Sequence, residues 1–312
     1  MIFTYVKRHS PIYNMNQLQK YTWLIETIRR AGKISHKELS DRWQRNKDLS
    51  DEKPLHRATF SRWKDAIFSQ FGIIISCQKV GGYLYYIENP EEIDDDKLKK
   101  WMLDSFAVGN IISENLSLKG RIVVDEIPSG RLFLTTMLEA VKENRTVVIT
   151  YRPFTSQESF TFPIKPYCIR LFENRWYVVG LNNRNEIRVY GLDRMESVEL
   201  SSETFKLPAD FSAEDLFSTR YGIVIGFDIK PETIILRAHG EHRHYLRSLP
   251  LHSSQRLINQ TDDYADFELY LSPTYDFILK LLHQADMIEV IKPASLRQTM
   301  KEWIVRMLSR YE

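Results

Sequence analysis

The chain has 312 residues, 43% of them hydrophobic and 27% charged, and its formal net charge is +2. This length and composition are typical of a globular protein of two or three domains, and no apolar run reaches the roughly 20 residues that a membrane-spanning helix requires. Residues 1–14 do not resemble a secretion signal, and two cysteines, Cys77 and Cys168, are too few for a disulfide framework or a cysteine-based metal site. We therefore expect a cytoplasmic protein.

The charge is unevenly distributed along the chain. Residues 1–89 contain 15 lysines and arginines against 8 aspartates and glutamates, whereas the remaining residues contain 28 against 33. A basic N-terminal part on a mildly acidic body indicates that the N-terminal part binds a polyanion and that the rest has another role.

Three helices are expected in the basic part. Residues 14–31 carry apolar side chains at spacings of three and four, the pattern of an amphipathic helix that ends before Gly32. Ser35 lies three residues before Glu38, a capping-box pattern that indicates the start of a second, shorter helix. A third helix is expected to begin near Pro54 and to run through residue 68. Its expected apolar stripe consists of Phe60, Trp63, Ile67 and Phe68.

The third helix also carries polar and cationic side chains. Arg57, Ser61 and Lys64 follow one another at spacings of four and three, which places them on a common face of the helix. His56 and Arg62 lie at the margins of that face. These five residues are the expected DNA contacts of the helix.

A hairpin is expected after the third helix. The β-rich runs 73–77 and 83–87 surround a Gly-Gly loop, and Lys79 lies at its tip. Three helices followed by a hairpin give the element order of a winged helix-turn-helix, in which the third helix enters the major groove of DNA and the hairpin lies on the backbone. An unrelated small helical domain with a hairpin is the alternative.

The next segment is expected to connect two domains. Residues 88–96 are acidic and include a proline, which is typical of a linker. Residues 97–118 and 131–144 then show helical periodicity without any cluster of catalytic residue types. We expect these helices to couple the DNA-binding domain to the rest of the chain or to pair two protomers.

The stretch 160–194 is expected to form the centre of a small β-rich module. Its runs 175–179 and 186–190 are rich in β-branched and aromatic residues and are bounded by turns that contain asparagine. Because side chains alternate along a strand, Tyr177 can share a side with Arg188 and Tyr190, while Trp176 packs in the core. Guanidinium groups match phosphate oxygens and aromatic rings stack on bases, so such a surface suits a nucleotide-like ligand. A barrel exterior with solvated arginines is the alternative.

At these residues the chain resembles the WYL-domain transcriptional regulators. The resemblance rests on Trp176-Tyr177-Val178, the preceding Pro166-Tyr167, the following Arg188 and the run Leu192-Asp193-Arg194, with valine where the signature has leucine. It extends over essentially the whole chain, and residues 205–225 resemble the segment that follows the barrel in Bacteroidetes-type members. The resemblance implies a Sm/SH3-like β-barrel sensor fused to a winged helix, with a basic pocket for nucleic acid or a nucleotide-type effector.

The flanking segments complete this organisation. Residues 146–152 are expected to open the barrel and residues 195–200 to close it. From residue 233 onward the pattern predicts elements in the order βαββαβ, which suggests a ferredoxin-like domain like the extension that often follows the WYL barrel. The expected fold class is therefore α+β and multidomain, with a winged helix-turn-helix at 1–89, a helical linker at 90–144, the barrel at 145–228 and the ferredoxin-like extension at 229–312.

A metal site and an enzyme are the alternatives from other classes. His239, Glu241, His242 and His244 form the densest group of metal-ligand residue types. They lack the helical i, i+4 histidine pair of zinc proteases, and a polar first turn of a helix explains them as well. The sequence contains no glycine-rich phosphate loop and no nucleophile elbow. An enzyme acting on nucleotides therefore ranks third among the functions, and we expect no cofactor.

The function expected first is a ligand-responsive, DNA-binding transcriptional regulator that acts as a homodimer on double-stranded DNA and senses a nucleotide or oligonucleotide. The alternative is a nucleic-acid-binding accessory protein that uses the barrel directly on single strands. The expected DNA contacts are His56, Arg57, Ser61, Arg62, Lys64 and Lys79. The expected ligand contacts are Tyr177, Arg188, Tyr190 and Arg194, with Lys165, Tyr167 and Arg170 as neighbours.

Overall fold

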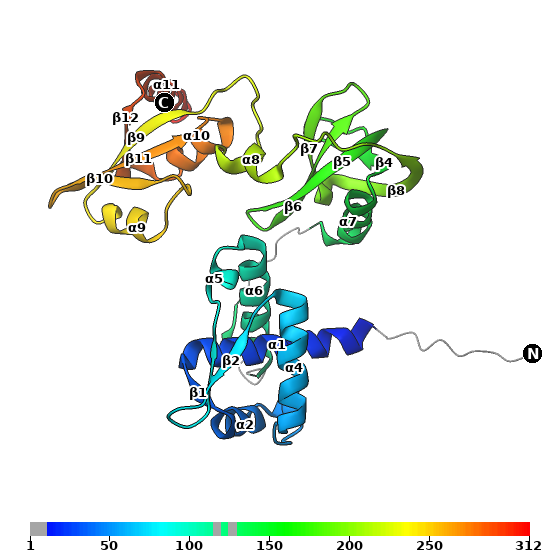
Figure 1. Ribbon diagram of the computed structural model, residues 1–312. Helices are drawn as coiled ribbons and strands as arrows, with labels where there is room; N and C mark the ends of the chain where they lie inside the picture. Colours follow the sequence, from blue (N-terminus) through cyan, green and yellow to red (C-terminus); the bar gives the residue numbers. More distant parts are fainter. Residues whose placement is uncertain (1–10, 115–119, 124–129) are drawn as a thin grey trace, which may run out of the picture. The chain divides into compact units, whose positions relative to one another are not determined.

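The computed structural model describes residues 11–114, 120–123 and 130–312, and the chain divides into two compact units (Figure 1). We refer to residues 1–124 as the head unit and to residues 125–312 as the body unit. Both units combine helices with antiparallel sheets. The expected α+β class is therefore confirmed.

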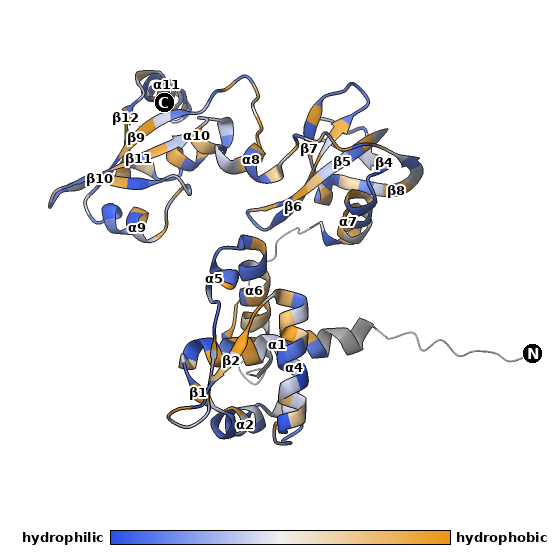
Figure 2. Cartoon of the chain, in the orientation of Figure 1, coloured by the Kyte–Doolittle hydropathy of each residue, from blue (hydrophilic) through white to orange (hydrophobic). Residues whose placement is uncertain are grey.

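The helices expected in the first part of the head unit are present. The helix expected at 14–31 is α1, and Gly32 follows it with a φ of 68°, a value that glycine adopts readily. The Ser35 side chain accepts a hydrogen bond of 3.2 Å from the backbone N–H of Glu38 and so caps α2, whose residues are mostly hydrophilic (Figure 2). The bounds are α1 Pro11–Ala31, α2 His36–Arg45, α3 Lys47–Ser50 and α4 Arg57–Phe71.

Helix α4 differs from the expectation at both ends. It begins at Arg57 rather than near Pro54, because the preceding His56 is in an extended conformation. It also continues to Phe71, so its buried stripe ends with Phe71, while Phe68 is 57% exposed. The prediction of Phe68 as a core residue was therefore wrong. A spacing of four from Ile67 keeps Phe71 on the buried side of the helix.

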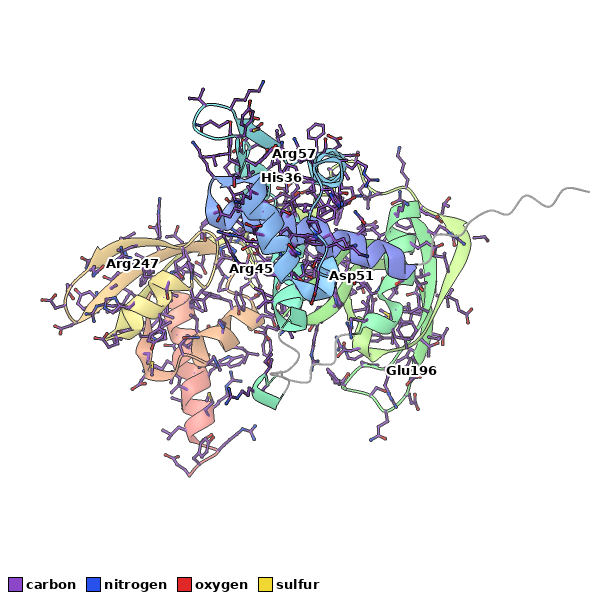
Figure 3. All side chains as sticks on the ribbon, turned by 90° about the horizontal axis from the view of Figure 1, so that it is seen from below. His36, Arg45, Asp51, Arg57, Glu196 and Arg247 are labelled. Carbon is purple, nitrogen blue, oxygen red and sulfur yellow. The ribbon has the colours of Figure 1, made fainter. Side chains whose placement is uncertain are left out.

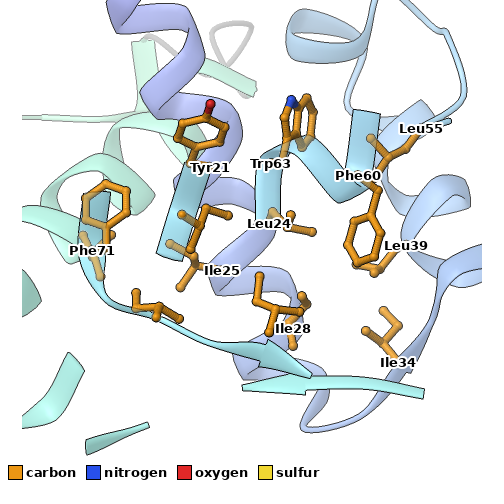
Figure 4. Packing of buried hydrophobic residues seen from close by; sticks show 14 of the residues in the cluster. Tyr21, Leu24, Ile25, Ile28, Ile34, Leu39, Leu55, Phe60, Trp63 and Phe71 are labelled. Atoms are coloured by element: carbon orange, nitrogen blue, oxygen red, sulfur yellow. The ribbon is translucent and has the colours of Figure 1, made fainter. Parts of the chain in front are cut away.

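The hairpin is confirmed, and a short third strand joins it. Strands β2 and β3 pair antiparallel, and β1 pairs with the other side of β3, so the sheet order is β1-β3-β2. The turn between β2 and β3 contains Gly81 and Gly82 with φ values of 89° and 118°. The core of the head unit lies between α1, α4 and this sheet (Figure 4). The strands are β1 Ile34–Ser35, β2 Ile75–Gln78 and β3 Leu84–Ile87.

The acidic segment 88–96, expected as a linker, packs against the head unit. It contains a short helix, α5 Glu91–Asp94, whose Ile93 is only 1% exposed within the head core. The Asn89 side chain accepts a hydrogen bond from the Ile74 N–H and donates one to the Gly72 carbonyl. These contacts hold the segment to the end of α4 and the start of β2.

Helix α6, Lys97–Glu114, also belongs to the head unit. Its Leu103 is buried in the same core, and the Asn110 side chain donates a hydrogen bond of 3.2 Å to the Gln19 carbonyl of α1. The expected boundary at residue 89 therefore does not coincide with the edge of this compact unit. Surface composition predicted a linker, but the buried apolar side chains Ile93 of α5 and Leu103 of α6 tie the segment to the core.

The body unit begins with a helix and a five-stranded antiparallel sheet. The sheet order is β7-β6-β5-β4-β8, so β4, expected to open the module, pairs with β8, expected to close it. Val147, Ile149 and Tyr151 lie on one face of β4 by alternation, and all three are buried. The elements are η2 Arg131–Phe133, α7 Leu134–Glu143, β4 Arg145–Tyr151, β5 Phe160–Phe172, β6 Arg175–Asn182, β7 Ile187–Gly191, η3 Leu192–Arg194 and β8 Met195–Thr204.

This sheet carries apolar clusters on both faces. On one face, which we call the α7 face, Val178 and Tyr190 pack with Met137 of α7. On the other, the α8 face, Cys168 and Val179 pack with residues of α8 Ala213–Ser218. The sheet is therefore covered on both sides, and neither face is an open solvated surface throughout.

The C-terminal part of the body unit has the expected order βαββαβ. Its four strands are all antiparallel to their neighbours and lie in the order β10-β11-β9-β12. Helices pack on this sheet through a core that includes Phe267 and Phe277. The elements are β9 Glu232–His239, α9 His242–Ser248, β10 Arg256–Gln260, β11 Tyr264–Leu271, α10 Tyr275–Leu282, η4 Ala285–Met287, β12 Ile288–Lys292 and α11 Ala294–Leu308.

Candidate functional site

The first candidate surface is the outer side of α4 in the head unit. Phe60, Trp63 and Ile67 hold one side of this helix in the core, which directs the opposite side to solvent. His56, Arg57, Ser61 and Arg62 are exposed, and Lys64 is half-buried. The exposed residues could reach the phosphates and base edges of a duplex.

Lys64 is held at the edge of the α4 surface by aromatic neighbours. Its ammonium nitrogen lies 5.7 Å from the ring centre of Phe60 and 5.7 Å from that of Tyr85 in β3, within the range of a cation–π contact. Burial lowers the pKa of the His36 imidazole, and the charge of the nearby Arg57 lowers it further (Figure 3). The same surface therefore joins residues of α2, α4 and β3, with Lys79 exposed in the hairpin turn.

The second candidate surface is on the five-stranded sheet, where the strand register separates Tyr177 from Arg188 and Tyr190. Tyr190 pairs with Val178 and Arg188 with Gly180, so both lie on the α7 face. Tyr177 pairs with Gly191 and therefore projects from the α8 face. The expectation that Tyr177, Arg188 and Tyr190 share one side was wrong. Alternation gives the two faces of each strand, but only the register decides which faces of neighbouring strands coincide.

Arg188 and Tyr190 line a pocket of ≈ 530 Å³ together with Tyr151 and Phe162. The Tyr190 ring lies edge-on to Tyr151, with 5.3 Å between ring centres, and 5.6 Å from Phe162. Arg188 is exposed, and its Nε and Nη2 donate to one Glu186 oxygen at 3.3 and 3.1 Å. An anion at Arg188 would thus compete with a carboxylate that is already bound.

Arg194 is held differently. It ends η3, and its guanidinium carbon lies 5.2 Å from the ring centre of Tyr151 and 4.8 Å from that of Phe154. Within the described part of the chain no carboxylate pairs with this guanidinium. It lines a pocket of ≈ 630 Å³ that also includes Arg152. A Cβ on Gly191 would lie 3.0 Å from Arg194 Nε, so the glycine leaves room for the side chain.

Tyr151 lines the first of these pockets and contacts Arg194, which lines the second. It also contacts Tyr190. Burial raises the pKa of the Tyr151 hydroxyl, while the Arg194 charge acts in the opposite direction. The Tyr151 hydroxyl can donate a hydrogen bond. The sequence predicted a strand at 146–152 that includes Tyr151 but gave no role for this residue, and Phe154 was missed. The available signal was the run Tyr151 to Phe154 at the end of a strand, in which an arginine and a proline lie between two aromatic residues.

The remaining expected ligand contacts lie elsewhere on the sheet. Tyr167 is buried and stacks on Phe205 with ring centres 5.8 Å apart. Arg170 pairs across the strands with Tyr177, and Lys165 with Leu181, so both are on the α8 face. Trp176, expected in the core, is half-buried and packs against the cluster of the α7 face, where Val178 is fully buried. The structure therefore places Arg188 and Tyr190 in one pocket and Arg194 in another, and it places their expected neighbours elsewhere on the sheet.

The histidine cluster considered as a metal site does not converge. His242 contacts Gln284 at 2.9 Å, and His239 lies 3.4 Å from Glu289. His244 lies 3.9 Å from Glu241. Among the residues that the structure describes, no three histidine, cysteine, aspartate or glutamate side chains are grouped for a metal ion. In the same residues no helix combines the length and apolarity needed to cross a membrane.

The comparisons with family models cover the body unit. Residues 133–200 match the model of the WYL domain, and residues 230–308 match the model of the WCX domain. The first match includes α7 and the whole five-stranded sheet up to Leu200, and the second includes most of the four-stranded sheet domain. No curated protein matches the chain.

Solved structures with similarity to the chain include two proteins. One is proteasome accessory factor B/C (PafBC) of Arthrobacter aurescens, with 17% identity and a TM-score of 0.25 over 60% of this chain and 28% of that chain. The other is a CRISPR Cas-related protein, with 11% identity and a TM-score of 0.38 over 99% of this chain and 88% of that chain. The chain thus spans less than a third of the length of the first structure.

Proposed function

The chain is a WYL-domain protein that also carries a WCX domain, and from this premise we propose that it is a ligand-responsive, DNA-binding transcriptional regulator. The family supports a regulator that binds DNA. The geometry of the five-stranded sheet supports a nucleic-acid or nucleotide-type ligand. In this proposal the chain itself catalyses no reaction.

The observation that carries the proposal is the outer surface of α4. A helix whose inner side is fixed by Phe60, Trp63 and Ile67 exposes Arg57, Ser61 and Arg62 to solvent. Cations on such a face can neutralise phosphates, and side chains of the helix can reach base edges in a major groove. The three-stranded sheet beside α4 supplies Lys79 in a hairpin turn.

We interpret the three parts of the chain accordingly. The order of helices α1, α2 and α4 followed by the β2–β3 hairpin fits a winged helix-turn-helix, with α4 as the recognition helix. The five-stranded sheet of residues 145–204 fits an SH3-like barrel. The strand order β10-β11-β9-β12 fits a ferredoxin-like domain. We propose that two copies act together on one DNA site.

The proposed ligand contacts centre on Arg194. Its guanidinium has no carboxylate partner in the described part of the chain and lies near the rings of Tyr151 and Phe154. A phosphate could pair with the guanidinium, and a base could stack on the exposed Phe154. Arg188 and Tyr190 extend this surface through Tyr151. Tyr177, Lys165, Tyr167 and Arg170 lie on or beside the other face and are not part of this proposed contact set.

Selection from a random pool of DNA duplexes tests this function. We expect the full chain to enrich one duplex sequence, and to do so with two inverted half-sites about one helical turn apart, because a symmetric pair of proteins reads a symmetric site. The matched control is residues 125–312, which lack the head unit and should enrich no duplex sequence. The accessory-protein alternative predicts the reverse: no duplex enriched by the full chain, and tight binding of long single strands by residues 125–312.

A further inference from the structure

The body unit contains a cationic pocket on the α8 face of the five-stranded sheet. It has a volume of ≈ 400 Å³, and its lining includes Arg170, Arg220, Phe217, Tyr221 and Leu251. No aspartate or glutamate is among the described residues that line it. Two guanidinium groups share a partly desolvated space there, which is unfavourable unless an anion balances them.

Arg170 lacks the partner that its surroundings require. Its guanidinium carbon lies 3.7 Å from the ring centre of Phe217, and its Nε is buried without a hydrogen-bond acceptor. Burial lowers the pKa of Arg170, and the charge of Asp276 only partly offsets this effect. The Asp276 Oδ2 already accepts hydrogen bonds from the N–H groups of Ile223 and Val224.

Arg237, in the four-stranded sheet, shows what is missing at Arg170. Its guanidinium carbon also lies 3.7 Å from an aromatic ring centre, that of Tyr264. In addition, its Nε and Nη2 donate to the two oxygens of Asp266 at 2.7 and 3.0 Å. The two arginines are stacked at the same distance, but only Arg237 has a carboxylate. An oxyanion from outside the chain would give Arg170 the same coordination.

Arg220 supplies the second positive charge and is fixed in position. Its Nε and Nη1 donate to the carbonyls of Ile225 and Leu216, each at 2.5 Å. In the described part of the chain it has no carboxylate partner, and burial lowers its pKa. Because both hydrogen bonds are to carbonyls, its positive charge is available to a bound anion.

The wall of this pocket is rigid. Gly222 has a φ of 80°, and a Cβ there would collide with Asp276 Oδ2, so only glycine fits beside that carboxylate. The adjacent Tyr221 ring is edge-on to Phe172, with 5.5 Å between ring centres, and lies 6.0 Å from Phe277. The loop that forms the wall is thus held before any ligand arrives, which lowers the entropic cost of binding.

An apolar groove continues from the cationic pocket. It has a volume of ≈ 670 Å³, shares Tyr221 and Leu251 with that pocket, and adds Tyr245, Leu249 and Met287. Leu249 is 78% exposed. A molecule with its anionic end at Arg170 could place an apolar body along these side chains and remove them from water.

We propose that Arg170 and Arg220, together with the groove beside Tyr221, bind a small organic anion that has one carboxylate or phosphate head and an apolar body. The site is separate from the proposed contacts at Arg194 and does not rest on them. The guanidinium groups bind the oxyanion head, and Tyr245, Leu249 and Met287 contact the apolar body. The size of the two pockets suits a small molecule.

Calorimetric titration of the full chain with phenyl phosphate, phenylacetate and inorganic phosphate tests this site. We expect at least one of the two phenyl compounds to bind about tenfold more tightly than inorganic phosphate, because only the phenyl compounds bury apolar surface. The preferred phenyl compound identifies the head group as phosphate or carboxylate. Arg170→Ala should weaken its binding at least tenfold, because the variant lacks a charge-assisted hydrogen-bond donor.

Two further variants keep the result interpretable. Leu249→Asp changes an exposed side chain, so it should preserve folding, yet it places a negative charge in the path of the ligand and should also weaken binding at least tenfold. Arg194→Ala should leave the affinity for the phenyl compounds unchanged. The proposal is overturned if neither phenyl compound binds, if Leu249→Asp keeps the wild-type affinity, or if Arg194→Ala lowers it as much as Arg170→Ala does.

Discussion

Charge reversal at two positions of α4, Arg57→Glu with Lys64→Glu, is expected to weaken binding to the selected duplex by at least a hundredfold. Each substitution removes a cation that neutralises a phosphate and adds a repulsive charge. Binding should also become less sensitive to salt. The slope of the logarithm of affinity against the logarithm of salt concentration should decrease in magnitude by about 0.9 for each phosphate that the variant no longer neutralises. Fluorescence anisotropy with a labelled duplex over a series of salt concentrations measures both effects.

The matched control for this variant is Lys142→Glu with Lys206→Glu. Both lysines are exposed on the body unit, and the pair changes the net charge by the same amount. It should therefore reproduce any effect of total charge without the specific weakening caused at α4. Lys64→Gln is a second control, since it removes the charge near Phe60 and Tyr85 without adding a negative one. If the α4 variant is folded and binds the duplex like the Lys142/Lys206 variant, α4 is not the recognition helix.

Removal of the Arg194 side chain is expected to have the largest effect on the proposed ligand surface. Arg194→Ala should weaken binding of a short single-stranded oligothymidylate at least tenfold, because a charge-assisted hydrogen bond contributes about 1.5–3 kcal/mol. Arg188→Ala should have a smaller effect, since Glu186 already binds that guanidinium. Arg194→Lys should restore only part of the affinity, because an ammonium group cannot form the two parallel hydrogen bonds of a guanidinium.

Arg256→Ala provides the control for the barrel variants. This arginine is exposed and pairs with Glu268 on the four-stranded sheet, so its removal changes the charge equally but leaves the five-stranded sheet intact. Titration calorimetry of the four variants with one oligonucleotide gives the comparison. Wild-type affinity in Arg194→Ala would mean that the ligand binds elsewhere and that Arg194 is only a surface side chain.

Periodicity predicted many elements of the fold from the sequence. The spacing of three and four in residues 14–31, the Ser35 cap and the order βαββαβ all correspond to elements of the structure. These features depend on neighbours in the sequence, which local propensity and alternation describe well. The short β1 was not predicted, because two residues carry no detectable period and their pairing with β3 depends on the rest of the head core.

The candidate site was only partly predictable, because it depends on register. A β-bulge between Pro166 and Cys168 and the pairing of Tyr177 with Gly191 decide which side chains share a face. Neither can be read from one strand alone. The same holds for Ile93, whose acidic surroundings predicted a linker although the side chain is buried. The Arg170 and Arg220 pocket was missed because its residues are 50 positions apart in the sequence and meet only through the packing of Phe217 and Tyr221.

Coupling between ligand and duplex is the measurement that tests the proposed regulator most directly. The affinity of the full chain for the selected duplex is measured with and without saturating oligothymidylate, and the affinity for oligothymidylate with and without the duplex. We predict that each ligand changes the affinity for the other by the same factor, about 5- to 150-fold, because linkage is reciprocal. If oligothymidylate leaves the affinity for the duplex unchanged and the duplex leaves the affinity for oligothymidylate unchanged, the result contradicts a sensor that controls DNA binding.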